Sequence, residues 1–189
     1  GENVFFRSIA TRNLPGGIPN LLNRMVDLLA HEGWTRIIIE TVGSGQSEIR
    51  IVAVADRLLL VEGPGRGDVI QAEKAGILEL ADLIVVNKSD LDGADRVADE
   101  IHLSLNLSEN EPAPVILCSA ETGDGIDSLI STIDSLPAAR GPAIARARER
   151  LLAAHQESLL SHSEFADVLK SFSEGDMSIE EALSILQRG

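Results

Sequence analysis

The strongest constraint on the fold is a set of short, almost wholly apolar runs that alternate with longer helical patterns. Two of these runs, 37–39 and 83–86, contain only Ile, Leu and Val. Strands that are apolar on both faces are typical of parallel sheets covered by helices. The expected strands are 4–6, 36–41, 57–62, 83–87 and 115–119, and the expected helices are 18–31, 69–80, 94–104 and 125–136.

This alternation predicts an α/β protein with a doubly wound, mainly parallel sheet and a C-terminal helical extension. Ligands of such folds bind at the carboxyl ends of the strands. The pattern stops near Pro137, so we expect one domain over 1–137 and a helical tail over 138–189. The tail predicts one long amphipathic helix over 143–172 and a short final helix over 178–186. It either packs on its own domain or serves as a dimerisation arm.

Charge and cysteine content narrow the class of protein. The formal net charge of −14 argues against a nucleic acid or an anionic membrane as the main partner. The single cysteine, Cys118, excludes an intrachain disulfide and suits a reducing compartment. The sequence has no apolar run near 18 residues and no signal-peptide pattern. We therefore expect a cytoplasmic protein.

The segment Asn87-Lys88-Ser89-Asp90 ends the most apolar run. A carboxylate there can accept hydrogen bonds from both the N1–H and the 2-amino group of guanine, and adenine offers no such donor pair. In this interpretation Asp90 reads the base, Asn87 contacts the base edge and braces the loops, and the Lys88 stem lies over the purine. The alternative is an ordinary turn in which Asp90 caps the next helix.

A second segment, Ser119-Ala120, ends the next apolar run. A turn of small residues lets backbone N–H groups approach the carbonyl oxygen of guanine, which adenine replaces with a donor. Alone, the segment also fits a plain link between a strand and a helix. Because the two motifs stand in this order at consecutive strand ends, together they favour guanine over adenine.

A third segment, 40–48, follows the Ile-rich run and reads E-T-V-G-S-G-Q-S-E. Glu40 at a strand end can hold a water molecule of a Mg²⁺ shell. Glu40 is therefore a candidate metal-binding residue, through water, and a candidate catalytic residue. Gly43 lets a backbone N–H reach a γ-phosphate, so the loop can sense hydrolysis. Gln46 is a candidate for orienting water or for the switch. The alternative is a flexible Gly/Ser loop.

Together the three segments resemble the G3, G4 and G5 motifs of a P-loop GTPase. The third segment resembles the corresponding segment of the MeaB/ArgK/MMAA family, which belongs to the SIMIBI class. The members of this family are G-protein chaperones of adenosylcobalamin-dependent mutases. Segment 4–17 resembles the switch I region of that family, 62–76 its additional switch loop, and 79–82 the approach to N-K-x-D. These segments supply the candidate switch residues Arg12, Arg66, Asp68, Gln71 and Lys74.

The resemblance implies a P-loop NTPase-like fold that binds GTP or GDP with Mg²⁺ and hydrolyses GTP. It also implies a B12-dependent acyl-CoA mutase as partner, such as methylmalonyl-CoA mutase, whose cofactor loading, protection or reactivation the protein assists. The helical tail would then form a homodimer.

One part of the GTPase pattern is missing, because the sequence has no G-x-x-x-x-G-K-[ST]. Its three lysines, Lys74, Lys88 and Lys170, do not stand in such a loop. Without that loop the β- and γ-phosphates lose their amide cradle and lysine. We expect an N-terminally incomplete chain that by itself hydrolyses GTP weakly or not at all. The alternative is a natural variant without catalysis.

Two other functions stay open. One is a metal-insertion GTPase of the same class, although the four histidines show no metal-ligand spacing. The other is a non-catalytic helical interaction module with a vestigial nucleotide site. Binding of guanine nucleotides would favour an enzyme over the interaction module. Capture of a mutase would favour a chaperone over a metal-insertion GTPase.

Overall fold

The computed structural model of the chain describes residues 4–9, 22–41, 51–65, 72–107, 111–137 and 143–187. The chain divides into two compact units, Gly1–Glu149 and Arg150–Gly189. The division falls inside the helix α6 (Ala143–Ser161) and therefore beyond Pro137. Among the described residues, no helix combines the length and the hydrophobicity needed to cross a bilayer.

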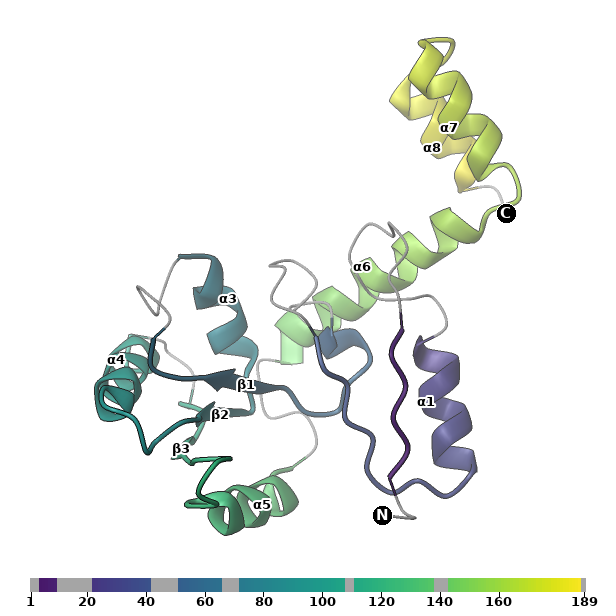
Figure 1. Ribbon diagram of the computed structural model, residues 1–189. Coiled ribbons are helices and arrows are strands. Elements are labelled where there is room, and N and C mark those ends of the chain that lie inside the picture. The colour runs from purple at the N-terminus through teal and green to yellow at the C-terminus, as the bar shows by residue number, and fades with distance from the viewer. Residues whose placement is uncertain are drawn as a thin grey trace. The chain divides into compact units, whose positions relative to one another are not determined.

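A parallel sheet lies at the centre of the first unit (Figure 1). Its strands in spatial order are β1 (Leu59–Glu62), β2 (Leu83–Val86) and β3 (Val115–Leu117). Val86 pairs with both Glu62 and Leu117, so the carboxyl ends of all three strands lie at one edge. All four residues of β2 are buried, as the apolar run predicts.

Helices cover both faces of this sheet, and Figure 1 shows α3 and α5 on opposite sides of it. The helices are α3 (Ala72–Leu80), α4 (Ala94–Leu105) and α5 (Ile126–Ser135). Ile84 and Val86 of β2 pack in one cluster with Leu78 of α3 and four apolar residues of α4 besides Ala94. Leu83 and Val85 point to the other face, where α5 covers them. The chain is thus α/β with a doubly wound parallel sheet, and the predicted fold class is confirmed.

A third apolar cluster lies beside β1 and joins it to the first helix of the described chain. It includes Leu22 from α1 (Leu22–His31), Ile51 and Val52 from a short 3₁₀ helix, and Ile77 and Leu80 from α3. These side chains lie next to Leu58, which precedes β1. The cluster extends the core of the first unit beyond the edge of the sheet.

A buried ion pair fixes the start of α6 within the first unit. The Asp82 carboxylate, which is fully buried, accepts a hydrogen bond from the Leu58 backbone N–H at 2.7 Å and another from the Arg146 guanidinium. Arg146 also donates to the Leu80 carbonyl at 3.1 Å. The first turns of α6 are therefore held by polar contacts from Arg146 rather than by an apolar stripe.

Two expected strands, 4–6 and 36–41, are not strands in the structure. Within the described residues, neither run has the parallel neighbour whose backbone hydrogen bonds would make it a strand. Their apolar side chains are largely exposed, including Phe6 at 83% and Ile38 at 84%. Phe5 instead lies near Trp34, with 6.2 Å between ring centroids. The prediction of strands here is wrong, because a strand also needs a neighbouring strand to pair with, and the described part of the chain supplies none.

The second unit contains the end of α6 and a hairpin of α7 (Phe165–Glu174) and α8 (Ile179–Leu186). The expected single helix over 143–172 is wrong, because the chain turns at His162–Glu164. The His162 carbonyl accepts from the Phe165 N–H, and its ring nitrogen Nδ1 accepts from the Glu164 N–H at 3.2 Å. These local bonds take the place of helical ones.

The final helix begins as predicted. Ser178 and Glu181 form a capping box, in which each side chain accepts a hydrogen bond from the other's backbone N–H. Val168, Ala182 and Leu186 form the small core between α7 and α8. The predicted apolar stripe of the tail is not buried: Ile144, Leu151 and Leu169 are 86%, 71% and 53% exposed.

Candidate functional site

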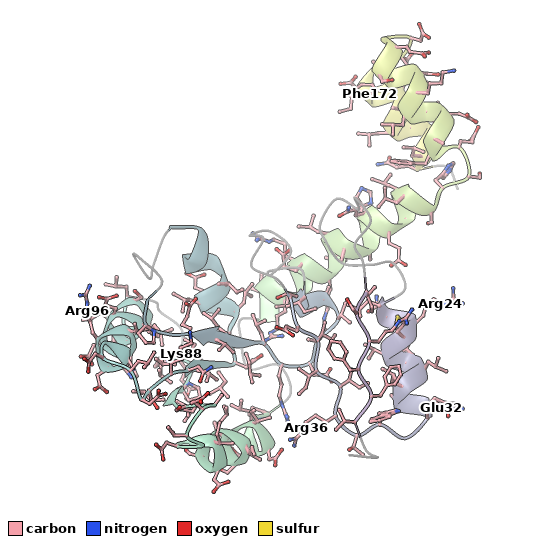
Figure 2. The ribbon with its side chains drawn as sticks, in the orientation of Figure 1. Arg24, Glu32, Arg36, Lys88, Arg96 and Phe172 are labelled. Atoms are coloured by element: carbon pink, nitrogen blue, oxygen red, sulfur yellow. The ribbon has the colours of Figure 1, made fainter. Side chains whose placement is uncertain are left out.

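Three loops leave the sheet at the same edge. Gly63–Gly65 follows β1, Asn87–Asp90 follows β2, and a turn at 118–125 follows β3. Parallel strands in register bring these loops together although they are far apart in sequence. Figure 2 shows the Lys88 side chain among them.

The side chain of Asn87 joins the second and third loops. Its oxygen Oδ1 accepts hydrogen bonds from the backbone N–H groups of Lys88 at 2.8 Å and Ala120 at 3.1 Å. The Ser89 N–H also donates to the Cys118 carbonyl at 3.0 Å. The structure thus brings Asn87, Lys88 and Ala120 into one hydrogen-bonded group.

Lys88 has an unusual backbone conformation. Its φ of 62° is the one positive value at a non-glycine residue in the described part of the chain. Such a conformation costs free energy and persists only where the surroundings impose it. Here the bond from the Lys88 N–H to Asn87 and the bond from the Leu91 N–H to the Lys88 carbonyl impose it. Strained residues of this kind concentrate at functional sites.

Two glycines allow the backbone at this edge to approach closely, and neither was among the predicted site residues. A Cβ atom at Gly63 would lie 2.9 Å from the Asn87 carbonyl oxygen. A Cβ atom at Gly125 would lie 2.3 Å from the Leu117 carbonyl oxygen, and the φ of Gly125 is 73°. Each glycine directly follows a strand or its turn, which is the signal that could have identified it.

The turn after β3 is closed by hydrogen bonds of Ser119, which is fully buried. The Ser119 N–H donates to the Asp124 carbonyl at 2.9 Å, and its carbonyl accepts from the Gly123 N–H at 2.8 Å. Its hydroxyl oxygen accepts from the Thr122 N–H at 3.2 Å. Ser119 is therefore an anchor of the turn, and Ala120, which follows it, is exposed.

The exposed groups at this edge are chemically distinct. Asp90 presents a carboxylate that accepts no hydrogen bond from the described residues, and Lys88 is exposed two positions before it. Below the turn, Cys118 is 3% exposed, and burial raises the pKa of its thiol. An exposed carboxylate beside a lysine stem and a backbone turn can bind a planar ligand that has adjacent N–H donors.

The described hydrogen bonds at this edge include none of the other predicted site residues. Glu40 is exposed, in the run 36–41, which forms neither a helix nor a strand. Lys74 lies on α3, and its side chain is outside the described part. The predicted residues that lie outside the described ranges are Gly43, Gln46, Arg12, Arg66, Asp68 and Gln71. Within those ranges, no three His, Cys, Asp or Glu side chains gather in a group that could hold a metal ion.

Comparison with known proteins gives a family for the chain. The family model described as methylmalonyl Co-A mutase-associated GTPase MeaB matches residues 1–173. A Pyrococcus horikoshii protein is 42% identical over 132 aligned positions, in a match that covers 67% of this chain and 42% of that protein. The mouse methylmalonic aciduria type A homolog, which is mitochondrial, is 37% identical over 69% of this chain and 33% of its own length.

The GTPase ArgK of Escherichia coli is 34% identical over 68% of this chain and 41% of its own length. The chain thus spans less than half the length of the curated relatives that it matches. The family match covers both the sheet with its loops and the first helices of the tail. The chain therefore belongs to the MeaB family of methylmalonyl-CoA mutase-associated GTPases.

Proposed function

We propose that this chain is the guanine-reading part of a GTP-binding, GTP-hydrolysing protein that assists a B12-dependent acyl-CoA mutase. The observation that carries the proposal is the bridge from Asn87 to Lys88 and Ala120, which holds the two loops of the base site together. Membership of a family of GTPases supports the nucleotide, and the family's description supports the mutase.

In this proposal the base is read from two sides. Asp90 accepts hydrogen bonds from the N1–H and the 2-amino group of guanine, while the turn that begins at Ser119–Ala120 offers a backbone N–H group to the carbonyl oxygen of the base. The Lys88 stem covers the purine face, and Asn87 contacts the base edge. Adenine would place a donor against the turn and leave Asp90 unpaired, and a site with such unpaired groups rejects the wrong base strongly.

The segment 40–48 begins with a side chain that suits a divalent cation. Glu40 has an exposed carboxylate, and oxygen ligands, often through water, are what Mg²⁺ prefers. Bound there, Mg²⁺ would neutralise charge on the phosphates. Gly43 and Gln46 would sense the γ-phosphate from the loop that follows Glu40. Further switch candidates are Arg12, Arg66, Asp68, Gln71 and Lys74.

Catalysis requires more than these residues. The sequence contains no G-x-x-x-x-G-K-[ST] loop to cradle the β- and γ-phosphates. We expect the chain by itself to hydrolyse GTP weakly or not at all. A turnover rate equal to that of a full-length relative, such as the Escherichia coli GTPase ArgK, would contradict this expectation.

The partner and the assembly are also part of the proposal. Residues 1–137 would serve as the GTPase domain, and 138–189 as the dimerisation region. Exposed apolar side chains along the tail, including Leu151 and Phe172, support a role in contacts with a second copy. Figure 2 labels Phe172 on α7. The client would be an adenosylcobalamin-dependent mutase such as methylmalonyl-CoA mutase.

Thermal unfolding with nucleotides tests the proposed binding. A ligand at 100 times its Kd stabilises the folded state by about 2.7 kcal/mol, which raises the Tm by several degrees. GDP with Mg²⁺ should raise the Tm of the chain, and ADP at the same concentration should raise it much less. Equal shifts with GDP and ADP would show that the site does not read guanine.

Co-elution with purified methylmalonyl-CoA mutase tests the partner. The chain should elute with the mutase in size-exclusion chromatography, and a truncated variant that ends at Glu149, which keeps the buried Asp82–Arg146 pair, should show whether the rest of the tail contributes. Failure of the full chain to co-elute with the mutase, together with tight binding of Ni²⁺, would favour the metal-insertion alternative.

A further inference from the structure

The turn that carries Ala120 is shaped by hydrogen bonds rather than by core packing. Ala120, Glu121, Thr122 and Asp124 are all exposed, and buried Ser119 is the anchor of the turn. Exposed segments with no apolar contacts adopt one conformation only when local polar bonds hold it. The residues that make these bonds therefore decide where the backbone N–H groups of the turn lie.

Thr122 makes three of the bonds. Its backbone N–H donates to the Ser119 hydroxyl oxygen at 3.2 Å. Its own hydroxyl donates to the Asp124 carboxylate oxygen Oδ2 at 2.8 Å and accepts from the Asp124 backbone N–H at 3.3 Å. Since the Asp124 carbonyl accepts from the Ser119 N–H, Thr122 and Asp124 together tie both ends of the turn.

These bonds occupy nearly every amide of the turn. The N–H groups of Ser119, Thr122, Gly123 and Asp124 donate within the turn, and that of Ala120 donates to Asn87. The Glu121 N–H donates to no acceptor in the described part of the chain. A ligand carbonyl oxygen can therefore bind the Glu121 N–H without breaking a protein hydrogen bond.

We infer that Thr122 and Asp124 are positioning residues for base selection, which hold the Glu121 N–H where the carbonyl oxygen of guanine meets it. The inference rests on the proposed function and adds two residues to it. Neither side chain touches the base in this account. Each acts through the turn, so its loss should weaken specifically the contact to the base carbonyl oxygen.

Calorimetric titration of the full chain with GDP and with 6-thio-GDP isolates that contact. The analogue keeps the N1–H and the 2-amino group that Asp90 would read, but its sulfur accepts hydrogen bonds weakly. The unaltered chain should bind GDP more tightly than 6-thio-GDP. Thr122→Val should bind GDP about fivefold more weakly, the effect of one lost hydrogen bond, with little change for the analogue.

Two further variants control for general damage, and a third tests the inference independently. Thr122→Ser keeps the hydroxyl and should keep the preference for GDP. Thr132→Val removes a matched hydroxyl, which donates to the Ser128 carbonyl at 2.8 Å inside α5, and should also keep it. Asp124→Ala removes the acceptor of the Thr122 hydroxyl without altering Thr122, and should reduce the preference as Thr122→Val does.

The outcomes separate the inference from the function on which it rests. If Thr122→Val and Asp124→Ala fold and keep the GDP to 6-thio-GDP ratio of the unaltered chain, the positioning role is overturned and the guanine site stands. If both variants lower GDP and 6-thio-GDP binding equally, the role is merely structural and the inference is also overturned. If the unaltered chain binds GDP no better than ADP, the proposed function fails and takes this inference with it.

Discussion

The side-chain oxygen of Asn87 lies 3.1 Å from the backbone nitrogen of Ala120 and accepts its hydrogen bond across 33 positions of sequence. The same oxygen accepts from the Lys88 N–H and so stabilises that residue's left-handed backbone. One side chain therefore couples the loop that would read the N1 edge of guanine to the turn that would meet its carbonyl oxygen. This coupling makes the two loops a single site.

Removing the bridge should separate the loops. Asn87→Ala leaves two exposed backbone N–H groups to water, so the free energy of unfolding should fall by only about 1 kcal/mol. GDP affinity should fall by more than tenfold, because Asp90 and the turn no longer hold a fixed spacing. Asn106→Ala, an exposed asparagine at the end of α4, is the matched control. GDP binding by Asn87→Ala equal to that of the control would contradict the coupling.

Gly125→Ala should be strongly destabilising. The new methyl group would lie 2.3 Å from the Leu117 carbonyl oxygen, and the residue would also have to keep a φ of 73°. We expect a loss of more than about 3 kcal/mol in urea unfolding, since strain and overlap add. Gly123→Ala has a similar φ of 86° but open space around its Cβ, so it should cost about 1–2 kcal/mol. Equal losses would show that the contact with Leu117 contributes nothing.

The buried pair of Asp82 and Arg146 should matter far more than an exposed pair. Asp82→Ala leaves the Arg146 charge buried without its partner, which typically costs about 3–5 kcal/mol. The Arg36–Asp134 pair, with both side chains 55% exposed, serves as control, and Asp134→Ala should cost about 0–1 kcal/mol. Urea unfolding of the two variants compares them, and a smaller loss at Asp82 than at Asp134 would contradict the structure.

Because the Cys118 thiol is buried, we expect the protein to lose stability at high pH. Burial raises its pKa above the ordinary value of 9.0, so the unfolded chain ionises at a lower pH than the folded one. The contribution of the buried thiol to stability is complete below the pKa that Cys118 has in the unfolded chain. It is lost as the pH rises through the pKa that Cys118 has in the folded chain. Between the two pKa values the free energy of unfolding falls as the pH rises, by at most about 1.4 kcal/mol per pH unit. Cys118→Ala should flatten the curve above pH 9, and an unchanged slope would refute the assignment.

The sequence predicted the parts of the fold that rest on local pattern. Leu83–Val86 is apolar on both faces, and it is the fully buried central strand. The motifs after it and after 115–117 lie at one sheet edge because parallel strands leave no other arrangement. The Ser178–Glu181 capping box also follows directly from residue spacing.

Features that depend on distant partners were not predictable. The runs 4–6 and 36–41 have the composition of strands, but a strand also needs a neighbour to pair with. The break at His162 depends on one side-chain acceptor inside an otherwise helical pattern. Likewise, nothing in the local sequence of Arg146 shows that its charge meets Asp82, 64 positions earlier.

The proposed role of Asp90 in selecting guanine can be tested by calorimetric titration of the chain and of Asp90→Asn with GDP, xanthosine diphosphate and ADP. The unaltered chain should prefer GDP, and Asp90→Asn should shift toward xanthosine diphosphate, because an amide can donate to the base carbonyl that replaces the 2-amino group. Asp92→Asn, two positions further on, should keep the preference for GDP. A folded Asp90→Asn variant with undiminished preference for GDP would show that Asp90 does not read the base.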